Sequence, residues 1–581
     1  MELSILSERS GMQTRKRKKL NRWFITLGAL VFLVFLLIAG FLLTTHVSPP
    51  SIKDRAPETW RVTHPDSGLS AIGNDRLRRN KYGLWELYVE GKPFERGVAT
   101  GKLTKELLYK QEKAFVNQLR EIVPSTVYRH FLKYFIYWFN RRLDHYIPEE
   151  FKEEIYGISL SASDEFSFIG SGYQRMLNYH SAHDIGHALQ DMRLVGCSSF
   201  GAWNSMSADS SLIIGRNFDF YVGDDFAENK IICFEKPDSG YAFMMVTWGG
   251  MAGCVSGMNE QGLTVTMNAS KSEIPFSART PVSILAREIL QYASDIREAY
   301  AIAGKMQTFV SESLLIGSAN DHKAVIIEKA PFETGLVEPR KDYILCTNYF
   351  QSEKFRDDRL NKESMRDNAS VYRYRRLLED VTGERPLTPA KAAWILRDRK
   401  GAGGKDIGNG NEKAMNQLIA HHSIIFEPEK GLVWVSTNPW QAGSYICYNL
   451  TEIFTTFAGL EKNREIAQEE LRIPADPFLE TNEYKAFLDF RKMRREFAGI
   501  LRMKDPVLPG KDFTSTFIAS NPEFYEVYSL TGDYYFNRGE WEKAGRLYRQ
   551  ALSKVIPRWS EKAKIIRNLA RCNIRLMENE R

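Results

Sequence analysis

The chain has 581 residues, of which 43% are hydrophobic, and a formal net charge of +7 at neutral pH. This length allows two or three domains, and the apolar content suits a globular core. Much of the positive charge lies in residues 15–19, so no general nucleic-acid-binding surface is expected. The six cysteines are widely scattered without a C-x-x-C pair, which argues against a zinc site or a small disulfide scaffold.

Residues 24–43 form an uncharged apolar stretch, about as long as a transmembrane helix. The basic segment 1–23 precedes it and should stay in the cytoplasm, which places the rest of the chain on the exported side, periplasmic or extracellular. A cleavable signal peptide is the alternative. The length of the apolar run and the lack of a clear cleavage site after it favour an uncleaved anchor. The polar, proline-containing residues 44–82 are interpreted as a linker.

A strand is predicted over 84–91, where polarity alternates, and a helix over 97–122, where leucines recur at helical spacing. Helices are expected to continue to about residue 192, including 182–193.

Three histidines, His180, His183 and His187, fall in this helical region. No carboxylate pattern such as His-Glu-x-x-His accompanies them, so the sequence predicts no metal site.

From residue 197 the pattern changes to short strands interrupted by pairs of helices. Clustered antiparallel strands with helix pairs between them predict an α+β domain over 197–460, with two sheets between helical layers. Strands are predicted at 198–203, 212–220, 231–236, 241–248, 254–268 (a hairpin), 314–316, 324–327, 343–346, 423–426 and 432–436, and helices at 282–292, 296–305, 370–381 and 389–397.

The glycine-rich residues 401–410 lack the Gly-Lys-Ser/Thr ending of a phosphate-binding loop. They are interpreted either as a mobile loop near a substrate entrance or as a solvated connection.

Residues 461–520 are predicted to be a helical connector, and 521–581 change character again. Aromatic and small residues there follow the spacing of one tetratricopeptide unit: Tyr528, Gly532, Tyr535, Trp541, Ala544, Tyr548 and Ala551. One unit is too few for an independent solenoid. These helices are therefore either a degenerate repeat docked on the main domain or a site for a protein partner.

Two short motifs point to chemistry: Gly196-Cys197-Ser198-Ser199-Phe200, and Gly215-Arg216-Asn217-x-Asp219. Cys197 alone reads as an ordinary buried thiol. Together the motifs resemble the N-terminal-nucleophile (Ntn) hydrolases of the penicillin acyltransferase and bile-salt hydrolase kind. More closely, they are similar to the acyl-coenzyme A:6-aminopenicillanate acyltransferase-like cysteine peptidases. That family has threonine where Ser198 stands.

The resemblance covers roughly residues 83–449 and leaves both termini unexplained. It implies a four-layer α/β/β/α sandwich, with 83–196 as a helical pro-segment. It also implies self-cleavage between Gly196 and Cys197, which would give an anchored chain 1–196 and a catalytic chain 197–581. Cleavage would supply the base that a thiol nucleophile needs, because the new α-amine of Cys197 has a reference pKa of about 7.7–8.0.

The resemblance assigns roles to five further residues. Arg216 would favour the thiolate, and Asp219 would hold the new amine. Strand alternation puts these two side chains on opposite faces, so a bulge or the strand end must bring them together. The remaining matches, given in chain order, are Asn268, Asn348 and Arg373.

Asn268 lies on the polar face of the predicted strand 262–268, and Asn348 follows a strand end. Either amide could stabilise an oxyanion, although asparagine at a strand end is often only a turn former. Arg375 and Arg376 leave the register of Arg373 open. His422 is interpreted as structural.

The sequence therefore predicts a membrane-anchored cysteine amidase or acyltransferase without metal or organic cofactor. Its substrate would be a small-molecule or lipid-like linear amide. Two alternatives stay open at this point: a cysteine–histidine hydrolase without chain cleavage, and a catalytically silent scaffold that binds a partner through its C-terminal helices.

Overall fold

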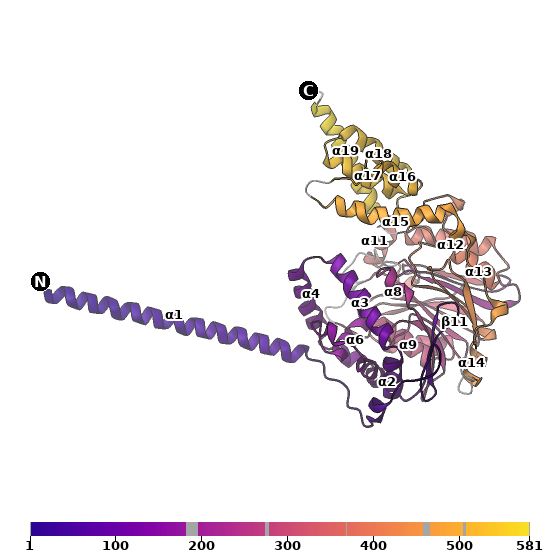
Figure 1. The fold of residues 1–581 in the computed structure, drawn as a ribbon, viewed down its shortest axis with the longest axis horizontal. Coiled ribbons are helices and arrows are strands. Elements are labelled where there is room, and N and C mark those ends of the chain that lie inside the picture. Colours follow the sequence, from indigo (N-terminus) through magenta and orange to yellow (C-terminus); the bar gives the residue numbers. More distant parts are fainter. Residues whose placement is uncertain are drawn as a thin grey trace.

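Two β-sheets lie face to face between layers of helices in the computed structural model (Figure 1), which describes residues 2–181, 196–272, 278–367, 369–456, 465–503 and 507–579. Neighbouring strands are antiparallel, except that β4 pairs in parallel with β7. In spatial order, the first sheet contains β1 (Thr63–Asp66), β2 (Leu69–Ile72), β3 (Asp75–Arg79), β4 (Trp85–Gly91), β7 (Ile231–Pro237), β8 (Phe243–Thr247), β9 (Ser256–Asn259), β10 (Leu263–Ala269), β11 (Glu312–Ser318), β12 (Lys323–Lys329) and β13 (Thr334–Val337). The second contains β14 (Tyr343–Cys346), β5 (Ser198–Asn204), β6 (Ser210–Phe218), β15 (His422–Glu427), β16 (Leu432–Ser436) and β17 (Tyr445–Asn449).

Three apolar cores hold these four layers together. The core between the sheets joins Met244 and Ile326 of the first sheet to Ile214 and Val435 of the second. The outer face of the first sheet packs against α2 (Pro93–Leu103), α9 (Val282–Tyr292) and α10 (Ile296–Lys305). The outer face of the second packs against α12 (Ser370–Gly383) and α13 (Pro389–Leu396). The predicted mixed α/β architecture with two sheets between helices is thus present.

Strand β10 illustrates how sequence alternation creates these layers. Leu263, Val265 and Met267 point into the core beneath the helices, as the alternation predicted. Thr264 and Asn268 lie on the opposite face, which looks toward the second sheet.

The first helix, α1 (Glu2–Thr45), contains a candidate membrane span at Trp23–Thr45, with a mean hydropathy of 2.8. It projects away from the sandwich (Figure 1). By length and composition it suits an anchor, and its place near the N-terminus also fits a signal sequence.

Two predictions for the N-terminal half are wrong in detail. The interpreted linker 44–82 contains β1–β3, which extend the first sheet because Ile72 and Leu77 join the core beneath the helices. The single helix predicted over 97–122 is interrupted at Thr104, between α2 and α3 (Lys105–Ile122).

The histidine group predicted not to bind metal is described only in part. His180 ends α6 (Gly172–His180) and is buried. Its Nδ1 lies 2.7 Å from the Met176 carbonyl oxygen, and its Nε2 accepts a hydrogen bond from the Ala252 amide. Both ring nitrogens therefore have main-chain partners. His183, His187 and the helix predicted over 182–193 lie outside the described residues.

The C-terminal helices share one aromatic core with residues next to the second sheet. This core joins Leu418 and Trp440 to residues of α15 (Asn482–Ile500), α16 (Phe513–Ser520), α17 (Tyr525–Asn537), α18 (Trp541–Ser553) and α19 (Trp559–Asn579). A Cβ at Gly532 would lie 2.8 Å from the Tyr548 ring, so glycine permits the close approach of α17 and α18. These helices are docked on the main domain; their tetratricopeptide character stays a prediction.

The glycine-rich segment 401–410 takes part in this docking. Asn409 and Asn521 exchange two hydrogen bonds, of 3.2 and 2.8 Å, between side chain and main chain. A Cβ at Gly408 would lie 2.5 Å from the Phe524 amide nitrogen. Residues 407–409 of the segment are therefore buried in this contact with the C-terminal helices, whereas Gly403, Lys405 and Asp406 are exposed to solvent.

Candidate active site

Cys197 lies directly before β5 and is 1% exposed. Among the described residues, its sulfur has the Arg216 guanidinium at 3.8 Å and the Asp219 carbonyl oxygen at 4.0 Å as hydrogen-bond partners. Burial raises the pKa of the Cys197 thiol to about 11, although the charge of Arg216 opposes the shift. The thiol is thus protonated at neutral pH and requires a base before it can act as a nucleophile.

Arg216 reaches from the second sheet to the first. Its Nη1 donates to the Val255 carbonyl oxygen at 2.9 Å and to the Ser256 hydroxyl, and its Nη2 donates to the Met267 carbonyl oxygen. The guanidinium also lies 4.3 Å from the centre of the Phe218 ring. Burial lowers the pKa of Arg216, but an arginine stays protonated in proteins. A positive charge is therefore held in place beside the Cys197 sulfur.

Asp219 follows the last residue of β6, so the chain has already left the strand. This explains how Arg216 and Asp219 approach the same thiol despite the alternation along β6. The Asp219 side chain is fully buried. Its Oδ1 has no hydrogen-bond partner within the described residues, and its Oδ2 accepts from Gln417 at 3.4 Å. Burial raises the pKa of Asp219 to about 7, against the lowering effect of Arg373 and Arg216.

The raised pKa of Asp219 predicts a specific pH dependence of stability. An unfolded aspartate loses its proton near pH 4, whereas the folded chain retains it up to about pH 7. The folded state binds more protons in this window, so its stability falls as the pH rises. In the Cys197→Ala background, which removes the nucleophile, Asp219→Asn should reduce the fall in Tm between pH 4 and pH 7. An equal fall in both proteins would contradict this.

Two asparagines link the sheets next to the thiol. Asn268 accepts a hydrogen bond from the Ser199 hydroxyl at 3.1 Å and donates to the Cys346 carbonyl oxygen at 3.2 Å. Asn348 donates to the Ala269 carbonyl oxygen at 2.9 Å and accepts from Arg373 at 2.6 Å. Both predicted amides thus lie in the same buried region as Cys197, and the described contacts fix their orientation.

Arg373 projects from α12 onto the main chain around the predicted cleavage site. Its Nη1 donates to the Gly196 carbonyl oxygen, and also to the Cys197 carbonyl oxygen and the Ser198 hydroxyl, both at 3.3 Å. The neighbouring Arg375 is exposed, and Arg376 forms ion pairs with acidic residues elsewhere. Among the three arginines, Arg373 is thus the one that contacts the main chain at Gly196 and Cys197.

Gln417 is a site residue that the sequence analysis missed. Its Nε2 donates to the Gly196 carbonyl oxygen at 2.8 Å, beside the Arg373 guanidinium. A Cβ at position 196 would overlap with this amide, so the contact requires glycine there. The available sequence signal is slight, two adjacent amides (Asn416-Gln417) before an apolar run, because 220 intervening residues separate Gln417 from Gly196.

His422 approaches the site through Arg216 and not through the thiol. Its Nε2 lies 2.8 Å from the Ser256 hydroxyl, which Arg216 also contacts, and its Nδ1 lies 2.9 Å from the Nδ1 of His421. Burial lowers the pKa of both histidines well below the usual value. This geometry fits the structural role expected for His422.

An apolar hollow lies close to the same group of residues. Phe218, whose ring lies under the Arg216 guanidinium, stacks on Phe220 with ring centres 5.6 Å apart. Phe220 forms part of the wall of the hollow, together with Phe226, Trp248 and residues of α3 and α6. Half of the residues that line the hollow are aromatic, and Gln111 and Glu112 of α3 add polar groups.

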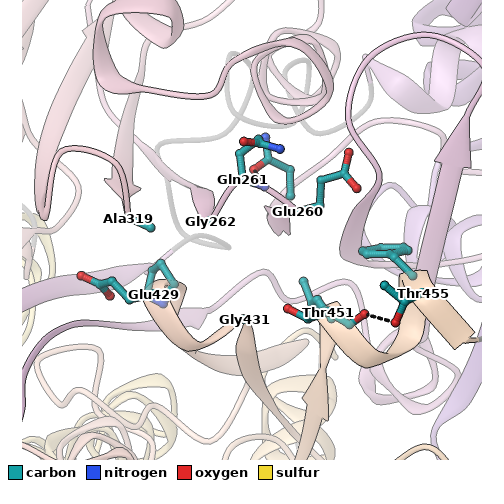
Figure 2. A pocket seen from close by; sticks show the side chains of 12 residues that line it. Glu260, Gln261, Gly262, Ala319, Glu429, Gly431, Thr451 and Thr455 are labelled. Atoms are coloured by element: carbon teal, nitrogen blue, oxygen red, sulfur yellow. Dashed lines mark hydrogen bonds between the residues drawn. The ribbon is translucent and has the colours of Figure 1, made fainter.

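A second, polar hollow lies at the other end of the sheets (Figure 2). Turn residues Glu260, Gln261 and Glu429 line it, together with Thr451 and Thr455 of α14 (Leu450–Thr456). β10 leads away from its rim, so Asn268 is about 20 Å distant at 3.3 Å per strand residue. None of the predicted catalytic residues lines this hollow.

A buried thiol beside two arginines and an aspartate, between two sheets with helices outside, agrees with the class of cysteine amidases and acyltransferases that the motifs resemble. Residues 205–438 match the family described as acyl-coenzyme A:6-aminopenicillanic acid acyl-transferase. The match confirms the suspected family resemblance. It begins after Cys197 and includes the other predicted catalytic positions, from Arg216 to Arg373.

Three proteins of similar sequence come from a nematode, an archaeon and a slime mould. The N-acylethanolamine-hydrolyzing acid amidase of Caenorhabditis elegans is 24% identical over 268 residues, which cover 42% of this chain and 69% of that protein. An uncharacterized protein of Archaeoglobus fulgidus is 26% identical over 235 residues, 37% of this chain and 38% of that protein. The protein dcd1A of Dictyostelium discoideum is 25% identical over 253 residues, 38% of this chain and 52% of that protein. The matches to the last two therefore span between a third and about half of their lengths.

Two solved structures are similar in part. The ortholog of N-acylethanolamine-hydrolyzing acid amidase from Caenorhabditis elegans is 16% identical, with a TM-score of 0.31, and covers 40% of this chain and 93% of that one. A mutant of the conjugated bile acid hydrolase of Clostridium perfringens is 13% identical, with a TM-score of 0.30, and covers 46% of this chain and 96% of that one.

Proposed function

We propose that this protein is a membrane-anchored cysteine amidase or acyltransferase that activates itself by cleaving the Gly196–Cys197 bond. One observation supports the cleavage most directly: the Gly196 carbonyl oxygen accepts hydrogen bonds from Arg373 and Gln417, and the Cys197 thiol follows in the chain. Two donors on one carbonyl oxygen are what stabilisation of an oxyanion requires.

The proposed self-cleavage begins with loss of the thiol proton, for which Asp219 is the candidate acceptor, because its pKa is about 7. The Cys197 sulfur then attacks the Gly196 carbonyl carbon, and negative charge develops on the oxygen held by Arg373 and Gln417. The C–N bond breaks, and the leaving nitrogen takes up a proton. Water hydrolyses the resulting thioester, which yields a Gly196 carboxylate and a Cys197 residue with a free thiol and a free α-amine.

In the mature protein the new α-amine would accept the thiol proton, and Asp219 would hold the amine toward the sulfur. The thiolate, favoured by Arg216, attacks the carbonyl carbon of a linear amide. The amine part of the substrate leaves with a proton, and an acyl group stays on Cys197. Water or a second amine then releases it. Asn268 and Asn348 are the candidate donors and positioning residues for this step.

The aromatic rings of Phe218 and Phe220 next to the site support a substrate with an apolar acyl group. The names of two similar proteins, an N-acylethanolamine-hydrolyzing amidase and a conjugated bile acid hydrolase, suggest the compounds to test first. The cysteine–histidine alternative has less support, because His422 is engaged by Ser256 and His421.

The proposal predicts two measurable products. N-terminal sequencing of the purified protein should give a fragment that begins with Cys197-Ser198-Ser199. The same preparation should release free amine from an N-acylethanolamine or from a bile-acid conjugate. A chain that stays intact while it hydrolyses amides would disprove the self-cleavage and retain the amidase. A chain that stays intact, hydrolyses no amide and still performs its role in the cell would favour the scaffold alternative.

A further inference from the structure

Helix α4 (Thr126–Phe139) has an unusual composition for a helix on a protein surface. Its sequence is Thr-Val-Tyr-Arg-His-Phe-Leu-Lys-Tyr-Phe-Ile-Tyr-Trp-Phe, and within the described part of the chain none of its residues is buried. Most of its aromatic and aliphatic side chains face outward. The most exposed are Val127 (81%), Phe131 (63%), Tyr128 (54%), Tyr134 (48%) and Trp138 (47%).

An exposed apolar surface of this kind indicates a binding site, because large contiguous apolar patches on soluble monomers usually mark a contact with a protein, a ligand or a membrane. The patch continues beyond α4. Lys133 donates a hydrogen bond to the carbonyl oxygen of Phe168, whose ring is 55% exposed.

The position of α4 points to one kind of partner. The Phe41 ring of α1 lies 6.0 Å from the Tyr134 ring and 6.2 Å from the Trp138 ring. Phe41 is four residues before Thr45, where the candidate span ends, and four residues of helix rise about 6 Å. α4 therefore contacts α1 where the span would leave the hydrocarbon core, and it lies on the side of the domain from which α1 projects (Figure 1).

The basic residues of this region are placed as they are at a membrane interface. Lys133 lies 5.6 Å from the Tyr134 ring centre, and Arg141 lies 4.2 Å from that of Trp138. Tryptophan and tyrosine concentrate at the boundary between lipid and water, and lysine and arginine extend their charged ends toward the headgroups there.

We propose that α4 lies in the bilayer interface, with its apolar face among the acyl chains beside α1. The inference rests on the proposed membrane anchor, and it adds a second contact with the lipid that holds the catalytic domain against the membrane surface. An amphipathic helix with aromatic and aliphatic residues on one face and basic residues at its borders binds in this manner.

The test uses the full chain in vesicles of phosphatidylcholine and phosphatidylglycerol, with the photo-crosslinker p-benzoylphenylalanine in place of Phe131. The matched control carries the same crosslinker in place of Trp394, which is 50% exposed on α13, at the opposite side of the sandwich. After flotation and illumination, mass spectrometry of the peptides should find lipid adducts at position 131 and none at position 394.

The outcomes separate this inference from the anchor. A chain that does not float with the vesicles disproves the anchor, on which the inference depends. A chain that floats but forms no lipid adduct at position 131, or equal amounts at both positions, disproves the inference alone. A crosslink from position 131 to a second copy of the chain also overturns it, because the patch would then be a protein interface.

Discussion

The Cys197→Ala variant is expected to remain a single polypeptide and to lose amide turnover. The methyl group cannot attack the Gly196 carbonyl, so neither the thioester nor the α-amine forms. Removal of the nucleophile in a comparable serine hydrolase lowers kcat by about 10⁶-fold, so a loss of at least about 10⁴-fold is expected here. Gel mobility and intact mass measure the cleavage, and release of amine measures the turnover.

Cys447→Ala is the matched control for this variant. Cys447 is also a fully buried cysteine, but it lies on β17 in the core beneath α12 and α13. The Cys447→Ala variant should cleave itself and hydrolyse amides like the wild type, apart from a modest loss of stability. Fragments in the Cys197→Ala protein would show that another group breaks the chain, and the proposed mechanism would fail.

The second large effect, a slower self-cleavage, is expected when either of the two hydrogen-bond donors to the Gly196 carbonyl oxygen is removed. Arg373→Ala removes one donor and also leaves the Asn348 amide oxygen without its 2.6 Å partner. Gln417→Leu removes the other donor with a side chain of similar size. Loss of one oxyanion donor lowers a rate by about 10²–10³-fold, so the half-time of self-cleavage should lengthen by about that factor in each variant.

Arg375→Ala controls for the loss of positive charge from the same helix, because Arg375 is exposed and should leave the cleavage rate unchanged. Thermal melting of each variant in the Cys197→Ala background separates a change in rate from a failure to fold. Stable Arg373 and Gln417 variants that cleave at the wild-type rate would remove these residues from the mechanism.

Much of the sandwich could be predicted from local patterns. The helices at Val282–Tyr292 and Ile296–Lys305 have the predicted bounds, because apolar residues at helical spacing face one side of the first sheet. Strands β1–β3 were missed because their polar and charged residues outnumber the few buried apolar side chains, among them Ile72 and Leu77. β3 forms a strand by pairing with β4, and β2 and β1 then add to it in turn, so these strands depend on pairings that a local window does not contain.

Candidate site residues came from the sequence in two ways, from short motifs and from a family resemblance. Cys197, Arg216 and Asp219 lie within two short patterns, and the others followed from a resemblance along the chain. Gln417 belongs to no motif, and its function arises from a contact with Gly196 that the fold creates. The role proposed for α4 also depends on the fold. From the sequence its aromatic residues could equally belong to a core, and only the structure shows that they are exposed beside α1.

The amino-acid sequence by itself determined the apolar N-terminal helix, the alternation of strands and helices, and the nucleophile motif. Each of these features depends only on residues that are close together in the chain. Tertiary structure alone decided which arginine of α12 contacts the Gly196 carbonyl oxygen and that Gln417 lies beside it. It also set the pKa of Asp219 near 7. These properties depend on desolvation and on hydrogen bonds between segments some 200 residues apart, and burial of that kind exists only once the two sheets have closed on each other.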